Sequence, residues 1–333
     1  MFIKKLRIVN FRNHKDSIFA FDKINYVSGK NGTGKTSLAE AISVILTLKS
    51  FRQHNFKKII SFDSDFLYLN AKLVDDKDNF TDIKFKYDKK KELFINDNKE
   101  PFDSYIKDKL LFTYSPENEG ILSKNQKDRR SFIDRVIFYK NFDYLSILKK
   151  YNKLLEIKKN ILESGKIDKD YLDVINEELL SLSLKITDFR VKEIKFLNKK
   201  LSQEFNNIFK NETFEILIKE NIPDKDNFKK EIFAGKILSG CHLDKIYFSL
   251  NGKIYEDFAS FGQRKTFSLI TLASILLSIE DFRKSGIILV LDDFEVGLDS
   301  ERIGVFKSIF EKYQLIITGV ENRYFKNANN ITL

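Results

Sequence analysis

One eight-residue stretch, residues 29–36, constrains the fold of this chain more than any other. It reads Gly-Lys-Asn-Gly-Thr-Gly-Lys-Thr and fits the pattern Gly-x4-Gly-Lys-Thr, in which backbone N–H groups, a lysine and a hydroxyl converge on a polyphosphate and its magnesium ion. An apolar run from Ile24 precedes it, and apolar residues recur behind it at helical spacing, from Leu38 to Ile45. This strand, loop and helix order directs a helix N-terminus at an anion. The stretch therefore predicts a nucleotide triphosphate site.

A second cluster carries acidic chemistry. The apolar run 287–291 predicts a central parallel strand, and it ends in Asp292 and Asp293. Doubly wound sheets bind their ligands at the carboxyl ends of such strands. We expect Asp292 to hold magnesium together with the hydroxyl of Thr36, and Asp293 to orient or deprotonate the attacking water. Because Asp293 is one methylene shorter than a glutamate, slow hydrolysis is the expectation.

The predicted catalytic residues are Lys35 and Asp293. The residues predicted to bind ATP are those of the phosphate loop and the residue after it: Gly29, Lys30, Asn31, Gly32, Thr33, Gly34, Lys35, Thr36 and Ser37.

A third segment precedes an apolar helix. Ser260 is a good N-cap and Gly262 allows close approach of a backbone, so residues 260–265 are expected to form a second anion-binding helix end. Together with Gln263 they resemble the signature motif of ABC-type ATPases. In those proteins the signature of one subunit closes over the nucleotide of another, which implies a head-to-head dimer. Leu298 and Asp299 then fall where that superfamily keeps its D-loop.

Composition narrows the partners. The 333 residues carry 58 basic and 48 acidic side chains, a net charge of +10, which favours nucleic acid or an acidic membrane surface unless it reflects coding bias. The single cysteine, Cys241, fits a reducing cytoplasm. The run 267–279 is too short to span a membrane, and no apolar signal segment follows the N-terminus. We therefore expect a cytoplasmic protein without a membrane partner.

The chain changes its pattern along its length. Alternating residues predict strands at 2–13 and an antiparallel layer at 66–98, whereas two long helices are expected at 126–163 and 168–209. A strand at 245–250 with a hairpin turn at 251–252 and a final strand at 315–318 follow. The predicted fold is α/β: an ABC-type ATPase head, with a phosphate-loop parallel sheet and an added antiparallel β layer, and an inserted helical arm lobe. The ATPase lobe is expected at residues 1–115 plus 236–333, and the arm at residues 116–235.

The first half of the arm is strongly basic. Residues 124–166 hold twelve Lys or Arg against five Asp or Glu, a net charge of +7. This one-sided charge favours a face that contacts DNA phosphates, and an ordinary solvated helix is the alternative. The candidates for DNA contact are Arg129, Arg130, Arg135, Lys149 and Lys150.

The order of these pieces resembles the bacterial RecF family, relatives of the SMC-type ATPases. The resemblance covers nearly the whole chain, through residues 6–13, the phosphate loop, 48–52, 114–117, 128–134, 240–244, 260–264 and 291–302. It implies ATP and Mg²⁺ as cofactors, an ATP-dependent homodimer on DNA, and weak DNA-stimulated hydrolysis. It also implies a role in DNA replication, recombinational repair and the SOS response to DNA damage, in which the protein helps RecO and RecR to load RecA at gapped or junction DNA. The implied DNA partners are double-stranded DNA and single-stranded or gapped DNA.

Several positions depart from the family pattern. The segment 240–245 reads Gly-Cys-His-Leu-Asp-Lys in place of Gly-Pro-His-Arg-Asp-Asp, which puts a charge network there in question. Gly297 replaces the usual serine before Leu298, and the segment 319–321 has no histidine switch. For the Q-loop, Gln53 and Glu117 are equal candidates.

Two other functions stay open. A transporter motor subunit would need a membrane partner and gives no reason for a basic arm. A non-hydrolysing DNA scaffold would use the nucleotide only to hold two copies together.

Overall fold

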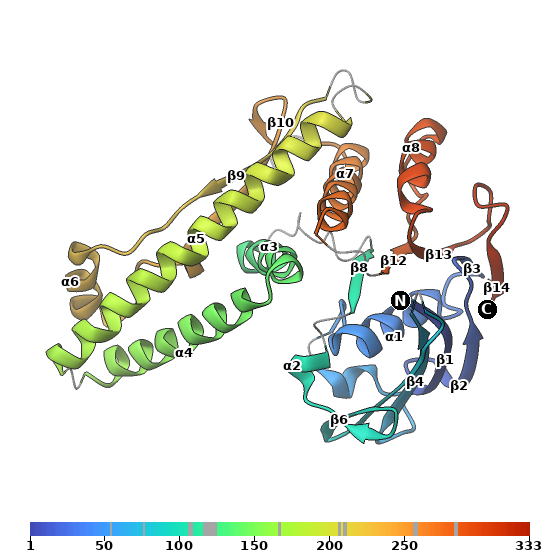
Figure 1. Ribbon diagram of the computed structural model, residues 1–333, viewed down its shortest axis with the longest axis horizontal. Coiled ribbons are helices and arrows are strands. Elements are labelled where there is room, and N and C mark those ends of the chain that lie inside the picture. Colours follow the sequence, from blue (N-terminus) through green and yellow to red (C-terminus); the bar gives the residue numbers. More distant parts are fainter. Residues whose placement is uncertain are drawn as a thin grey trace. The chain divides into compact units, whose positions relative to one another are not determined.

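The chain forms two compact units, residues 1–120 with 284–333 and residues 121–283. The computed structural model describes residues 1–53, 55–75, 77–105, 109–115, 125–165, 168–205, 208, 212–255, 259–282 and 286–333 (Figure 1). The boundary expected at residue 236 differs from this division. Residues 236–283 associate with the helical unit because β10 (Lys245–Leu250) pairs with β9 (Phe214–Lys219), and α7 (Phe261–Glu280) packs on α5 (Lys169–Phe205).

A parallel sheet carries the predicted nucleotide strands. Its order is β14 (Asn329–Thr332), β3 (Ile24–Ser28), β13 (Gln314–Gly319), β12 (Ile287–Asp292) and β8 (Leu110–Tyr114). β12 and β13 are buried along their whole length, as continuous apolar strands in the middle of a parallel sheet should be. The predicted strand before the two aspartates is therefore confirmed. β14 was not predicted, because Asn-Asn-Ile-Thr has a single apolar residue and so no period to detect.

An antiparallel sheet forms the second layer of this unit. Its order is β2 (His14–Ala20), β1 (Phe2–Phe11), β4 (Leu67–Val74), β5 (Phe80–Asp88), β6 (Lys90–Ile95) and β7 (Asn98–Lys99). Buried and more exposed residues alternate along β4, because one face of the strand covers the core and the other meets solvent. The added antiparallel layer predicted for residues 66–98 is confirmed.

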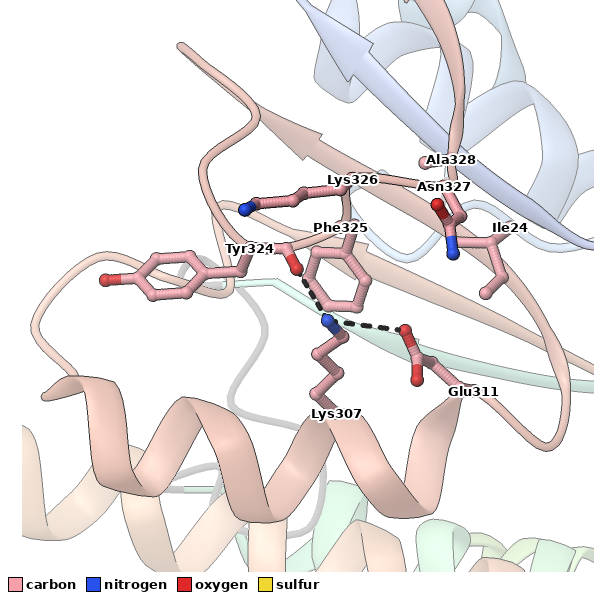
Figure 2. Close-up of a pocket in the computed structure, with 8 residues that line it drawn as sticks. All are labelled: Ile24, Lys307, Glu311, Tyr324, Phe325, Lys326, Asn327 and Ala328. Atoms are coloured by element: carbon pink, nitrogen blue, oxygen red, sulfur yellow. Dashed lines mark hydrogen bonds and ion pairs between the residues drawn. The ribbon is translucent and has the colours of Figure 1, made fainter.

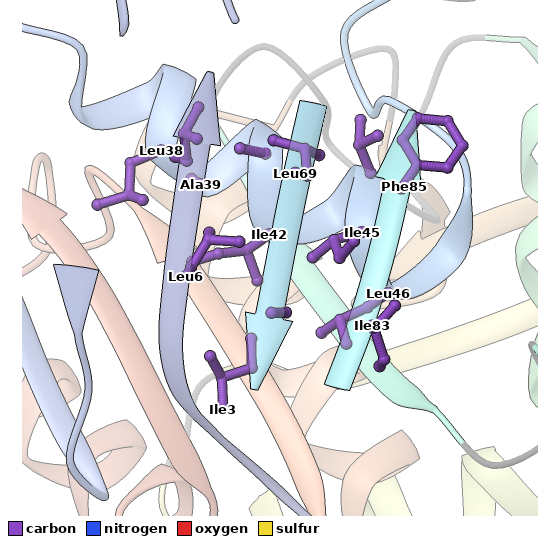
Figure 3. Packing of buried hydrophobic residues seen from close by; sticks show 14 of the residues in the cluster. Ile3, Leu6, Leu38, Ala39, Ile42, Ile45, Leu46, Leu69, Ile83 and Phe85 are labelled. Carbon is purple, nitrogen blue, oxygen red and sulfur yellow. The ribbon is translucent and has the colours of Figure 1, made fainter. Parts of the chain in front are cut away.

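The core of this unit lies around α1 (Lys35–Thr47). This helix touches β1, β4 and β5 of the antiparallel sheet and also β8, β12 and β13 of the parallel sheet. Figure 3 shows Ile42 and Ile45 of the helix among Leu6 of β1 and Leu69 of β4. A helix between two sheets is covered on all sides, which explains why residues 37–46 are all buried. Three short elements complete the unit: η1 (Phe56–Ile59), α2 (Phe102–Tyr105) and α8 (Ser300–Phe310).

In the second unit, the stretch predicted as two long helices forms three described helices, α3 (Gln126–Lys140), α4 (Asp143–Ser164) and α5. α3 ends at Asn141, whose extended backbone closes the helix, and α4 starts directly after it. α4 ends at Gly165, a left-handed C-cap with φ 66°, which agrees with the predicted break. α4 then lies beside α5, the longest helix described (Figure 1).

A small antiparallel sheet of order β11-β10-β9 packs with these helices. The hairpin between β10 and β11 (Lys253–Ile254) turns at Asn251 and Gly252, both with positive φ, so the Asn-Gly prediction is confirmed. The unit also holds α6 (Lys225–Ala234) and η4 (Cys241–Leu243). Among the described helices of both units, none is long and apolar enough to cross a bilayer.

Candidate nucleotide-binding site

The phosphate loop connects β3 to α1. Lys35, the first residue of α1, donates from its Nζ to the carbonyl oxygens of Gly29 at 2.8 Å and Lys30 at 3.0 Å, so its ammonium lies across the loop. The loop tip at Lys30, Asn31 and Gly32 is exposed. Within the described chain no side chain caps the start of α1, and this leaves its first N–H groups available to a phosphate.

Residues at the turn between β1 and β2 contact the backbone of the phosphate loop. Asn13 Nδ2 donates to the carbonyl of Thr33 at 3.0 Å, and His14 Nε2 lies 3.2 Å from the carbonyl oxygen of Gly34. Gly34 has φ 110°, and a Cβ there would lie within 2.9 Å of both side chains. Only glycine fits this position, because it needs a left-handed backbone and close contact at once. The third glycine of the motif predicted this position, but the motif gave no sign of the contacts with Asn13 and His14.

The carboxyl end of β12 meets the phosphate-loop helix. Asp292 Oδ1 accepts from the hydroxyl of Thr36 at 3.1 Å and from the hydroxyl of Thr318 at 2.5 Å. Asp292 is only 3% exposed, and burial raises the pKa of its carboxyl group. Two motifs 256 residues apart are thus in direct contact through Thr36 and Asp292, and their joint binding of magnesium stays a prediction.

These oxygen atoms fit a magnesium ion. Mg²⁺ prefers hard oxygen ligands and is usually held by one or two carboxylates together with substrate phosphates and water. A carboxylate beside a hydroxyl at the foot of a phosphate loop provides such ligands. In the parts of the chain that the structure describes, no three His, Cys, Asp or Glu side chains form a metal cluster. Thr36 and Asp292 would hold the ion together with phosphate oxygens and water.

Asp293 has an unusual backbone. Its φ is 47°, a left-handed conformation that is uncommon for a residue with a side chain. Its N–H lies 3.2 Å from both the carbonyl and the hydroxyl oxygen of Thr318, which hold it in place. Thr318 thus contacts both aspartates and was missed from the sequence. The available signal was a polar residue closing the apolar strand 315–317 in register with Asp292.

A buried carboxylate behind the loop was also missed. Glu40 on α1 is fully buried, and both of its oxygens accept from the guanidinium of Arg12 at 2.9 Å. The hydroxyl of Ser50 donates to Glu40 at 2.5 Å, and Arg52 lies 4.0 Å from it. Ser50 also accepts from the backbone N–H of Gln53 at 2.8 Å. Glu40 therefore joins the phosphate-loop helix to the β1–β2 turn and to the segment with the Q-loop candidate Gln53, whereas Glu117 lies outside the described residues.

The signature candidate begins α7 in the second unit. The Ser260 hydroxyl accepts from the N–H of Gln263 at 3.2 Å, and the Gln263 side chain accepts from the N–H of Ser260 at 3.0 Å. This capping box confirms the predicted N-cap. Ser260 is exposed and Gly262 half-buried. Their meeting with a nucleotide of a second copy stays a prediction.

The D-loop candidate follows β12 in the first unit. Asp299 is the N-cap of α8 and accepts from the N–H of Arg302 at 2.8 Å, and Leu298 before it is half-buried. Asp299 is exposed, so its carboxylate has a capping role and also faces solvent.

The DNA candidates on the arm divide by burial. Arg129 is only 2% exposed, donates to the carbonyl of Ile246 at 2.7 Å and lies over the ring of Phe248, so its prediction as a DNA contact is corrected: it anchors α3 to β10. Arg130 is half-buried and donates to the carbonyl of Asp244 at 2.6 Å.

The other three candidates keep more solvent contact. Arg135 is half-buried and lies over the ring of Phe132. Lys149 and Lys150 are exposed on α4, and Lys150 pairs with Glu178 of α5. The basic excess read from the sequence is therefore partly a set of internal contacts, such as those of Arg129 on α3 and Lys158 on α4, and partly exposed charge, such as Lys149 and Lys150 on α4.

The segment 240–245 does hold a charge network. Arg190 of α5 donates to both carboxylate oxygens of Asp134 at 2.8 and 2.9 Å, and to Asp244 at 2.9 Å. Asp244 is fully buried and also accepts from the hydroxyl of Thr187 at 3.1 Å. The expectation that the missing arginine at position 243 puts this network in doubt is corrected, because Arg190 supplies the guanidinium from a different helix.

One pocket of about 270 Å³ lies near Ile24, at the start of β3 and thus at the end of the strand opposite to the phosphate loop. Figure 2 shows Lys307 of α8 directed at its edge, where its Nζ donates to the carbonyl of Tyr324 at 2.7 Å and pairs with Glu311 at 3.7 Å. Lys307 thus has two polar partners from the protein at the edge of this pocket. The predicted nucleotide site at the phosphate loop lies at the other end of β3.

Comparisons with known proteins agree on one family. The model of the RecF/RecN/SMC N-terminal domain matches residues 2–332. The DNA replication and repair protein RecF of Clostridium acetobutylicum is 30% identical, over 99% of this chain and 97% of its own length. The protein of the same name from Lactobacillus johnsonii is also 30% identical, over 96% of this chain and 92% of its own.

Solved structures show the same fold. The recombination mediator protein RecF with ATP, from the RecFOR pathway, superposes with a TM-score of 0.86 at 24% identity and covers 98% of this chain and 94% of that one. An Smc head bound to the C-terminal winged-helix domain of ScpA has a TM-score of 0.57 at 13% identity, with 97% and 90% covered.

Proposed function

This chain belongs to the RecF family, and from that membership and the geometry of its phosphate loop we propose that it is an ATP-dependent DNA-binding protein of recombinational repair and replication restart. The observation that carries the proposal is the contact between Thr36 and Asp292, which joins the phosphate loop to the acidic strand end. A relative of the same fold has ATP in its described structure. The proposed substrate is therefore ATP.

The residues of the site have distinct proposed roles. The N–H groups of residues 29–37 and the ammonium of Lys35 bind the phosphates, and Thr36 and Asp292 would hold Mg²⁺. When bound, the ion offsets the negative charge that develops on the phosphates during transfer. Asp293 would orient the attacking water or accept a proton from it. Its short side chain is the proposed reason for slow hydrolysis, and stimulation of hydrolysis by DNA is proposed from the family.

Dimerisation is the proposed switch. Ser260, Gly262 and Gln263 of one copy would close over the ATP held by Lys35 of the other, with Leu298 and Asp299 at the same interface. In this functional sense residues 236–283 serve the ATPase lobe, because they carry Ser260, although they pack with the helices of the arm. ATP binding would assemble the dimer on DNA, and slow hydrolysis would release it.

The proposed partners follow from the family. The related RecF structure is described in the RecFOR pathway, so we propose that RecO and RecR act with this chain to load RecA on gapped or junction DNA, in the cytoplasm. On the arm, the exposed Lys149 and Lys150 of α4 are the proposed phosphate contacts, and the half-buried Arg130 and Arg135 of α3 are further candidates.

Sedimentation in the presence and absence of ATP and gapped DNA tests this function. We expect monomers without nucleotide and dimers with ATP and DNA. Ser260→Arg should abolish the dimer and leave ATP binding intact, because the new side chain is too large to meet a phosphate across an interface. A wild-type protein that shows no nucleotide-dependent dimer would rule out the switch.

Asp293→Asn separates a hydrolysing switch from a passive scaffold. If hydrolysis releases the protein, this variant should stay on DNA longer than the wild type when ATP is present. Equal residence times would mean that hydrolysis is not the release step.

A further inference from the structure

A buried tyrosine lies next to the loops that follow the two central strands. Tyr26 of β3 is fully buried, and its hydroxyl lies 2.7 Å from the carbonyl oxygen of Glu321 and 3.3 Å from Oε2 of Glu295. Glu295 lies three residues beyond the end of β12, and Glu321 lies two residues beyond the end of β13. One hydroxyl proton therefore faces two acceptors on two different loops.

The neighbouring backbone is fitted to this hydroxyl. A Cβ at Gly319, the last residue of β13, would lie 2.1 Å from the Tyr26 oxygen. Any side chain at that position would push the hydroxyl away from both acceptors. Burial, followed by the charge of Glu295, raises the pKa of Tyr26, so the hydroxyl keeps its proton.

The loop that Glu295 belongs to needs such support. It starts at Asp293, whose φ of 47° is held at one side by the N–H contacts with Thr318. Further along, the N–H of Leu298 donates to the carbonyl of Glu295 at 3.3 Å, so the fold of the loop depends on where Glu295 lies. The side chain of Glu295 ties the loop to β3 of the sheet through the Tyr26 hydroxyl.

We propose that Tyr26 is a positioning residue for ATP hydrolysis, which holds the 293–299 loop and the 320–321 segment in one arrangement through its shared hydroxyl. The inference rests on the proposed ATPase function. Because the Tyr26 hydroxyl bonds to Glu295 and Glu321, its effect falls on the placement of Asp293 and Asp299, and we expect nucleotide binding to stay unchanged.

Tyr26→Phe tests this inference, because it removes only the oxygen. We expect kcat for ATP hydrolysis to fall about five-fold, the size of one net hydrogen bond in the transition state, while the Kd for ATP stays as in the wild type. The midpoint of unfolding of the first unit should fall by only about 2–4 °C, because the two acceptors lose their shared donor. Gly319→Ala should lower kcat in the same way, since its methyl group displaces the hydroxyl. Tyr324→Phe is the matched control, because it also removes a tyrosine hydroxyl, here from a residue that lines the pocket near Ile24. This variant should leave kcat unchanged.

Hydrogen exchange separates this inference from the proposed function. In Tyr26→Phe the amides of residues 294–299 should exchange faster, and those of α1 should not. An unchanged kcat with unchanged exchange would overturn the inference, and so would a Kd for ATP that weakens as much as kcat falls. If the wild type does not hydrolyse ATP, the proposed function fails, and the exchange of residues 294–299 still decides whether Tyr26 holds the loop.

Discussion

Glu40 offers the sharpest test of how the phosphate-loop helix is held. Its carboxylate is fully buried and receives two hydrogen bonds from Arg12 at 2.9 Å and one from Ser50 at 2.5 Å. Glu40→Gln keeps the shape and removes the charge, which leaves a guanidinium facing a neutral amide. Removing one partner of a buried ion pair costs about 3–5 kcal/mol. The Arg12 side chain is 22% exposed, so water can reach part of the guanidinium, and we expect the lower end, about 3 kcal/mol.

Unfolding in urea followed by far-UV circular dichroism measures this change, since the chain has no tryptophan to report by fluorescence. A loss of 3 kcal/mol should lower the thermal midpoint of the first unit by about 6–12 °C. The two units can unfold separately, so the transition that shifts has to be assigned to the first unit, for example by hydrogen exchange of α1.

Asp16→Asn is the matched control for Glu40→Gln. Arg7 donates to both oxygens of Asp16 at 3.0 and 2.8 Å, the same two-point geometry, but the two side chains are 48% and 51% exposed. Because water replaces a lost partner at the surface, this variant should unfold close to the wild type. Equal losses in the two variants would refute the reasoning that burial gives the Glu40 network its weight.

Three further outcomes follow from the same structure. Burial raises the pKa of the Asp292 carboxyl group, so its charged form destabilises the folded state above that pKa, and this cost disappears as the pH falls. Asp292→Asn should therefore have a midpoint of unfolding at least as high as that of the wild type near pH 7. The same variant should bind Mg·ATP more weakly in isothermal titration. Burial lowers the pKa of His242 to about 4, so as the pH falls the unfolded chain binds a proton at this position before the folded chain does. The free energy of unfolding of the second unit should therefore fall by up to about 3 kcal/mol between about pH 6.5 and pH 4. A series of urea titrations in which His242→Gln loses stability with pH as steeply as the wild type would contradict this. Replacing Lys149 and Lys150 by alanine should weaken DNA binding and flatten its salt dependence in a fluorescence anisotropy titration, whereas Arg129→Lys should lower stability first; unchanged DNA binding of the double variant would leave α4 as solvated surface.

The sequence predicted the elements whose signal is local. The phosphate loop, the strand ending at Asp292, the Asn251–Gly252 hairpin and the N-cap at Ser260 each depend on a few neighbouring residues, and all four are present in the structure. Alternation of apolar and polar residues also predicted the antiparallel layer. The helical arm was predicted as a region, but the end of α3 at Asn141 was not, because a single asparagine is a weak stop signal in a long periodic stretch.

What only the tertiary structure decided is which charges are inside. Arg129 and Lys149 look alike in a basic stretch, yet Arg129 is 2% exposed against β10 and Lys149 faces solvent. Arg190 pairs with Asp244, which lies 54 residues further along the chain, and Tyr26 meets two loops that follow it by more than 260 residues. Local sequence sets the shape of each element, because backbone preferences and side-chain periodicity act over a few residues. The partner of each buried charge depends on which elements pack together, since an ion pair or hydrogen bond inside the protein can join residues at any distance along the chain.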